Sequence, residues 1–200
     1  QYRVNAGDLP PDHWVRDPEQ GGGRIIGEVC HFVDFLSFIT GAVPTRVHAQ
    51  GLSNEGRYRD DNVIVTLELS DGSVGSVTYV AGGDRRVPKE RVEVFGGGAA
   101  AILDDFRRLE LVSDGRKKVY RSGLRRDKGH RHEWEVLLDS VRSGGPPPIP
   151  FDEIVATTLA TFRIVGALHS GTQMNVDVAG FISSSLGPDH EEAPGHREAP

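Results

Sequence analysis

Cysteine is nearly absent from this sequence of 200 residues, because Cys30 is the only one. No internal disulfide is therefore possible, and this fits a reducing compartment, so we expect a cytoplasmic location. Positive charge is also scarce, since 23 Lys and Arg residues stand against 29 Asp and Glu residues. A nucleic-acid binder needs a basic surface to neutralise phosphate, so no nucleic-acid partner is expected. No apolar run approaches the ~20 residues of a membrane span, so we expect no membrane partner either.

The remaining composition is that of an ordinary globular protein, with 37% hydrophobic and 26% charged residues. The length suits one domain with a proper core. Residues 1–23 begin with a short extended piece, continue as a proline-containing loop and end in three glycines. Residues 24–180 carry the regular patterns of one domain. Residues 181–200 are polar and proline-containing, and we expect them to form a disordered tail.

Hydrophobic periodicity predicts both helices and strands. Helical spacing of apolar residues appears over residues 25–40, 129–142 and 151–169. Strict alternation and hairpin turns such as Asp71-Gly72 and Asp114-Gly115 predict strands. The expected strands are 2–5, 45–52, 62–69, 73–80, 91–95, 100–103, 109–112 and 117–121, with a last edge strand at Val176 and Val178. The fold class is therefore α+β: a large, mostly antiparallel open sheet with helices packed on one face.

An open sheet of this kind leaves one broad face without helices. We expect that face to be covered by another copy of the chain, so that the protein forms a homo-oligomer through the sheet face. Val77 and Tyr79 are candidates for the outward side, unless Val74 and Val80 are the outward residues of that strand.

Three polar residues interrupt the apolar helix predicted at 25–40, namely Glu28, His31 and Asp34. Spacing of three places neighbouring side chains within reach along a helix. Histidine between carboxylates is a common arrangement for proton transfer. The same spacing also suits a hydrogen-bonded histidine of the core. Judged on spacing alone, this structural interpretation is somewhat favoured over a catalytic one. A metal site would need more ligands than this stretch supplies, so no metal is expected.

A longer motif surrounds these residues. The stretch WVRDP at 14–18 is followed by GGGRIIGEVCHFVD at 21–34 and by Gly41. It resembles a signature of the glucose–fructose oxidoreductase/inositol dehydrogenase (Gfo/Idh/MocA) family: a glycine-rich stretch, an aspartate four residues before a histidine, and an aspartate three residues after it. The resemblance covers about residues 2–178 and implies the α+β C-terminal domain of that family.

The resemblance implies that His31 is the catalytic histidine of an oxidoreductase that acts on a sugar-like substrate. The family's first aspartate falls at Gly27, where this sequence departs from the pattern, and Glu28 is a plausible substitute beside the ring. Asp34 matches the later aspartate, for which a substrate contact and a structural role both stay open.

The glycine fingerprint of a nucleotide-binding Rossmann domain and the lysine of the family's Glu-Lys-Pro motif are both missing from this sequence. Residues 1–23 would thus follow a Rossmann domain that lies outside it. NAD or NADP is expected in the full-length enzyme, and none is expected to bind this chain alone.

A basic stretch around Lys128 admits two interpretations. It is either a solvated hairpin and loop, which is the commoner case, or a rim that attracts an anionic substrate such as a sugar acid, with Arg24 serving the same end. The sequence also leaves an alternative function open. Because Gly27 replaces the expected aspartate, the chain could be a non-catalytic binding or oligomerisation module of the same fold.

Overall fold

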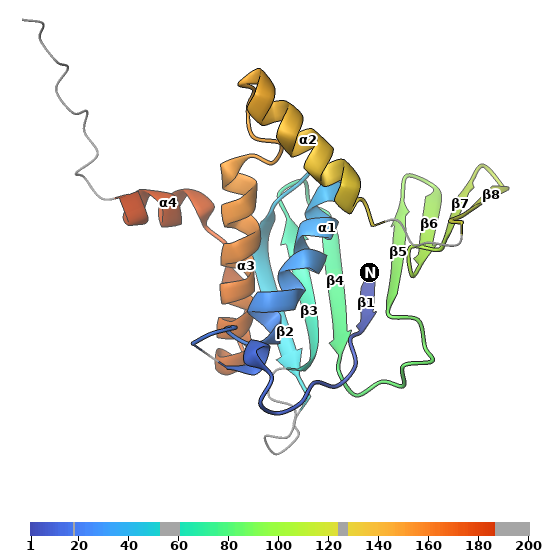
Figure 1. Cartoon of the computed structure of the whole chain (residues 1–200). Helices are drawn as coiled ribbons and strands as arrows, with labels where there is room; N and C mark the ends of the chain where they lie inside the picture. The colour runs from blue at the N-terminus through green and yellow to red at the C-terminus, as the bar shows by residue number, and fades with distance from the viewer. Residues whose placement is uncertain (18, 53–60, 124–127, 187–200) are drawn as a thin grey trace, which may run out of the picture.

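A single large sheet organises the chain, as seen in a computed structural model that describes residues 1–17, 19–52, 61–123 and 128–186. Within these residues the sheet has nine strands in the order β8-β7-β6-β5-β1-β4-β3-β2-β9 (Figure 1). Strand β1 runs parallel to β4, and the other neighbours that pair are antiparallel. The strands are β1 (Tyr2–Asn5), β2 (Pro44–Gly51), β3 (Asn62–Leu69), β4 (Val74–Val80), β5 (Glu90–Gly96), β6 (Ala99–Asp104), β7 (Arg108–Ser113), β8 (Arg116–Arg121) and β9 (Met174–Asn175). The predicted mostly antiparallel open sheet is confirmed.

Helices cover only the part of the sheet around β1–β4 (Figure 1). The π-helical turn η2 (Ile25–Val29), helix α1 (Cys30–Thr40) and helix α3 (Phe151–Ser170) pack there against the strands. Gly41 and Gly171 end α1 and α3 in the left-handed conformation. No helix in the described part of the chain is long and apolar enough to cross a membrane.

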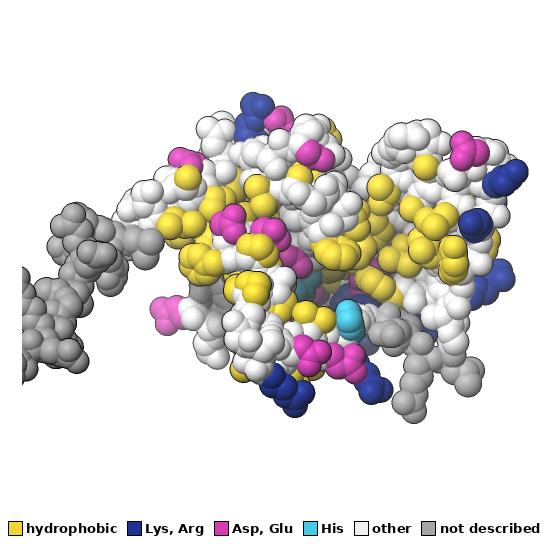
Figure 2. All heavy atoms as spheres, turned by 90° about the horizontal axis from the view of Figure 1, so that it is seen from above, with side chains coloured by type: hydrophobic (Ala, Val, Ile, Leu, Met, Phe, Trp, Pro, Cys, Tyr) yellow, Lys and Arg dark blue, Asp and Glu magenta, His cyan; other side chains and the backbone are white. Residues whose placement is uncertain are grey.

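Helix α2 (His130–Ser143) differs from the expectation that all three predicted helices cover the sheet. None of its residues is buried, so its apolar stripe adds nothing to the core. The helix lies beyond the ends of α1 and α3 (Figure 1), and hydrophobic side chains remain exposed on both sides of the hollow between the helical body and the outer strands (Figure 2).

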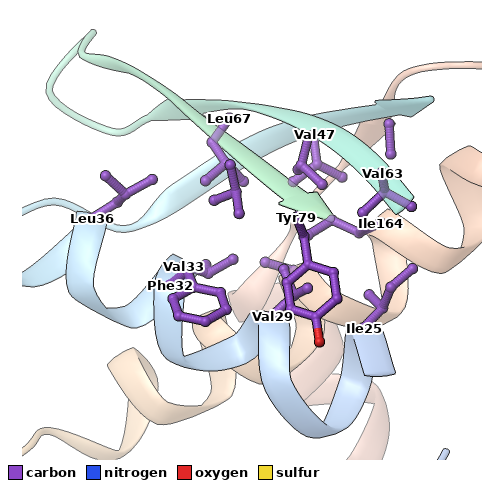
Figure 3. Packing of buried hydrophobic residues seen from close by; sticks show 14 of the residues in the cluster. Ile25, Val29, Phe32, Val33, Leu36, Val47, Val63, Leu67, Tyr79 and Ile164 are labelled. Carbon is purple, nitrogen blue, oxygen red and sulfur yellow. The ribbon is translucent and has the colours of Figure 1, made fainter. Parts of the chain in front are cut away.

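The core lies between η2, α1, α3 and the inner strands (Figure 3). Alternation along β3 buries Val63, Val65 and Leu67 toward the helices, as the pattern predicts. On β4 the register is now decided. Val77 and Tyr79 are fully buried on the helix side, whereas Val74 is 76% exposed on the opposite face. Of the two alternatives, the structure therefore selects the one with Val74 and Val80 on the outward side.

The C-terminal part also differs from the prediction. The last edge strand is β9, which pairs with β2 two residues before the predicted position. Val178 instead begins helix α4 (Val178–Leu186), where Asp177 accepts a hydrogen bond from the Gly180 N–H over 2.9 Å. Residues 181–186 are thus helical and do not belong to the predicted disordered tail, because an aspartate caps this short apolar stretch. Residues 187–200 lie outside the described part.

Candidate active site

The glycine-rich loop before η2 needs its glycines for close approach and for backbone conformation. A Cβ atom on Gly21 would lie 2.4 Å from the Cα atom of Val15, so only glycine fits there. Gly22 and Gly23 have φ angles of 67° and 89°, a region that favours glycine. The loop therefore turns sharply and delivers the chain to the start of η2.

The segment predicted as one α-helix begins with a π-helical turn. Residues Ile25–Val29 form η2, and regular α-helix follows only from Cys30. π-Helical turns are rare in proteins, and those that occur often lie at functional sites. A wider turn changes the angular offset between successive side chains, so the spacing argument that placed Glu28 beside His31 does not hold across this junction.

Glu28 points to the interior of the domain and not to His31. Its Oε1 accepts a hydrogen bond from Arg24 Nε over 3.1 Å, and its Oε2 accepts one from the Tyr79 hydroxyl over 2.7 Å. Burial and this carboxylate neighbour raise the pKa of Tyr79 well above its usual range, so the tyrosine keeps its proton and stays a donor. The sequence predicts Glu28 beside the imidazole, and in the structure its carboxylate contacts Arg24 and Tyr79 instead.

Arg24 belongs to the same closed network. It is 2% exposed, donates from Nη1 to the Gly7 carbonyl oxygen over 2.8 Å and lies over the Tyr79 ring. The guanidinium is therefore buried, and the contacts it makes are with other groups of the protein. The sequence predicts a substrate contact for Arg24, and the structure places its guanidinium against Glu28 and Tyr79.

His31 is exposed, unlike the buried Arg24. It opens the first turn of α1, and Asp34 is exposed one turn further on. Partial burial raises the pKa of Asp34, and the nearby His31 opposes that rise. Within the described residues, neither Glu28 nor Asp34 forms a hydrogen bond with the imidazole. The structure therefore brings His31 and Asp34 together and separates both from Arg24 and Glu28.

Lys128 lies beside the outer strands in a second polar cluster. Its Nζ is 2.6 Å from Glu90 Oε1, and the Glu90 carboxylate also accepts a hydrogen bond from the Tyr2 hydroxyl. Burial raises the pKa of Glu90, but the hydrogen bonds from Lys128 and Tyr2 outweigh that effect and hold it below the usual value. Lys128 also lies over the Phe106 ring, 5.1 Å from its centroid.

Sequence reasoning did not identify Tyr79, Tyr2, Glu90 or Phe106. For Tyr79 the sequence leaves both faces of the strand open, because alternation along one strand does not say which face meets the helices. Tyr2 and Glu90 meet across the β1–β5 pair, 88 residues apart in the chain. No local signal predicts such a contact.

Comparison with known proteins now adds to this geometry. The profile of the GFO/IDH/MocA C-terminal domain matches residues 1–101. The chain belongs to the Gfo/Idh/MocA family. The matched residues include the glycine loop, η2, α1 and the inner strands, which together hold His31 in place. No sequence match was found among functionally curated proteins.

Solved structures show the same Gfo/Idh/MocA fold at low sequence identity. UDP-N-acetylglucosamine 3-dehydrogenase GnnA from Acidithiobacillus ferrooxidans is 19% identical, with a TM-score of 0.67 over 84% of this chain and 52% of that one. An oxidoreductase domain protein from Kribbella flavida is 16% identical, with a TM-score of 0.72 over 88% and 58%. Levoglucosan dehydrogenase is 17% identical, with a TM-score of 0.72 over 88% and 57%. This Gfo/Idh/MocA chain spans about half the length of these proteins.

Proposed function

We propose that this chain is the substrate-binding and catalytic half of an NAD(P)-dependent oxidoreductase that acts on a hydroxyl or carbonyl group of a sugar-like substrate. The carrying observation is His31, an exposed imidazole at the start of α1, directly after the glycine loop and the π-helical turn. An imidazole titrates near neutral pH, so it can accept the proton of a reacting hydroxyl and return it to a carbonyl oxygen. Asp34 is exposed on the same helix, one turn away.

The nucleotide must be held by other residues than these. The glycine triplet Gly96–Gly98 joins β5 to β6 in a tight turn and does not open a helix, so it makes no phosphate cradle. When bound by a second, nucleotide-binding half, the nicotinamide supplies the hydride chemistry. The residues of this chain bind the substrate and move the proton. Isolated from that half, the chain is inactive.

One observation favours a second candidate, a non-catalytic module of the same fold. Gly27 stands where the family signature has a carboxylate, and Glu28 is engaged by Arg24 and Tyr79. His31 consequently lacks the carboxylate partner that the signature implies. The two functions differ in whether the histidine is needed for turnover.

The experiment uses the full-length enzyme that contains this chain, with NADH or NADPH formation followed by absorbance against a panel of sugars and polyols. His31→Ala should lower kcat by roughly 10²–10⁴-fold while the melting temperature and cofactor affinity stay unchanged. His48→Ala is the matched control, because His48 is also exposed but lies on β2. A well-folded His31→Ala enzyme that turns over at the parent rate would support the non-catalytic module instead.

A further inference from the structure

The two edges of the sheet differ in length. One edge is β9, with two residues, and the other is β8, with six residues that are all exposed. Strand β8 lies at the end of the sheet that is far from α1 and α3 (Figure 1). A long exposed edge strand presents unpaired backbone groups to an extended chain that meets it. β8 is therefore the edge at which this sheet can accept a further strand.

The pairing of β7 with β8 shows which backbone groups point outward. The Ser122 N–H donates to the carbonyl oxygen of Arg107 over 2.8 Å, at the end of this antiparallel pair. Hydrogen-bonded pairs alternate with non-hydrogen-bonded pairs along such a ladder. The backbone groups of Lys117, Val119 and Arg121 therefore point away from β7. Within the described residues, none of these groups has a hydrogen-bond partner beyond the edge.

Positive charge is concentrated on β8, although the chain as a whole has a net charge of −6. The strand has the sequence RKKVYR, with four cations and no acidic residue. Lys117 forms an ion pair with Glu110 of β7. In the part of the chain that the structure describes, Arg116, Lys118 and Arg121 form no ion pair. Lys and Arg side chains gather at this end of the molecule (Figure 2), so the edge attracts negative charge.

The same charges disfavour a second copy of this chain as the occupant of the edge. Two β8 strands that pair antiparallel about a two-fold axis would place Arg116 of each copy opposite Arg121 of the other. Like charges directly opposite each other destabilise a strand pair, and charged edge strands keep identical proteins apart. An acidic strand would turn this repulsion into attraction. The edge therefore discriminates between partners by the sign of their charge.

The positive edge is separate from the candidate active site. Strands β7, β6 and β5 lie between β8 and β1. At about 4.8 Å for each strand, β8 is roughly 19 Å from β1 across the sheet. The helix that carries His31 packs on the inner strands. A small substrate at His31 does not span this distance, so the cations of β8 suit a different ligand.

We propose that β8 binds an acidic, extended segment of another protein as a tenth strand of the sheet. The backbone of the partner pairs with the outward groups of β8, and its carboxylates lie beside Arg116, Lys118 and Arg121. Val119 and Tyr120, which are 39% and 53% exposed, contact apolar residues of the partner. Main-chain hydrogen bonds supply affinity, and the side chains select an acidic sequence. This interaction is independent of the oxidoreductase activity.

The test measures binding of a designed peptide to the full-length protein by isothermal titration calorimetry. In the antiparallel register, acetyl-TEVVEEET-amide places glutamate opposite each of the four cations and valine opposite Val119 and Tyr120. The dissociation constant should be on the order of 10–100 µM and should rise with salt concentration. Hydrogen–deuterium exchange of residues 116–121 should slow in the complex. No binding, or protection only at other segments, overturns the proposal.

Two changes distinguish strand addition from a general attraction between charges. The first is a peptide with N-methyl groups on the residues opposite Lys117, Val119 and Arg121, which keeps its charge but loses its donors. The second is Val119→Pro, which removes an outward N–H and no hydrogen bond to β7. Each should weaken binding at least about tenfold, whereas Val119→Thr, which keeps the N–H, should bind as the parent does. Unchanged affinity of the methylated peptide refutes strand addition, even if Val119→Pro does not fold.

A charge reversal and two competing ligands complete the test. Lys118→Glu should weaken peptide binding about tenfold. Arg86→Glu is the matched control, because Arg86 is exposed in the loop between β4 and β5, and it should leave the affinity unchanged. Single-stranded DNA that binds as tightly as the peptide, and equally well to Val119→Pro, would show a general polyanion surface and overturn the proposal. Self-association of the protein that Val119→Pro abolishes would assign the edge to a second copy and also overturn it.

Discussion

The Arg24–Glu28 pair is predicted to be strongly coupled, and a double-mutant cycle can measure the coupling. The two side chains are 2% and 24% exposed, with Nε and Oε1 3.1 Å apart. Arg24→Met leaves the carboxylate with only Tyr79 as a donor and should lower the free energy of unfolding by about 3 kcal/mol. Removing both partners should cost less than the sum of the single changes. Hydrogen bonds to charged groups indicate a coupling of about 1.5–3 kcal/mol.

The assay is urea unfolding of the parent, Arg24→Met, Glu28→Gln and the double variant, followed by circular dichroism. The cycle isolates the pair, because the contacts of Arg24 with Gly7 are lost equally in Arg24→Met and in the double variant. The control is the pair Arg131–Glu135 on α2, with the same four-residue spacing and 2.9 Å between the same atoms, but 92% and 54% exposed. Its coupling should be about 0.3–0.5 kcal/mol. If the two cycles give the same small value, the prediction that burial strengthens the Arg24–Glu28 pair is refuted.

Three further changes have defined outcomes. Gly83→Ala should lower the free energy of unfolding by about 1–3 kcal/mol in thermal melts, because its Cβ would lie 2.0 Å from Oδ1 of the buried Asn5. Gly82→Ala is the control and should leave the stability unchanged, because its Cβ would meet no atom within 4 Å. Glu90 has a lowered pKa in the folded state. Its contribution to the free energy of unfolding is therefore complete above its pKa in the unfolded chain, which is about 4.3, and is lost as the pH falls through its pKa in the folded state. Glu90→Gln should therefore flatten the decline of stability between about pH 5 and pH 3 in acid-unfolding curves. Val74→Glu should weaken self-association through the open sheet face in sedimentation equilibrium, and an unchanged association constant would exclude that face.

Most of the secondary structure follows from local patterns in the sequence. The alternation over β3 and the Asp-Gly turns specify strands and hairpins through interactions between near neighbours, so they were predicted almost to the residue. The glycine loop and His31 also belong to a contiguous signature. Helix α4 was missed because its cap, Asp177, precedes a stretch with serines that looked like a tail.

The position of the candidate site was thus indicated by the sequence alone, as a glycine loop, one histidine and the helix that carries it, whereas the exposure of that histidine was decided by the structure. Only the tertiary structure decided which groups surround it. Glu28 turns inward because the π-helical turn changes its direction and because Tyr79, 51 residues later, offers a buried donor. Phe106 reaches α1 because β6 and β7 place their turn beside Phe35. Such contacts arise from strand order and register, which bring distant residues together, and a local pattern carries no record of them.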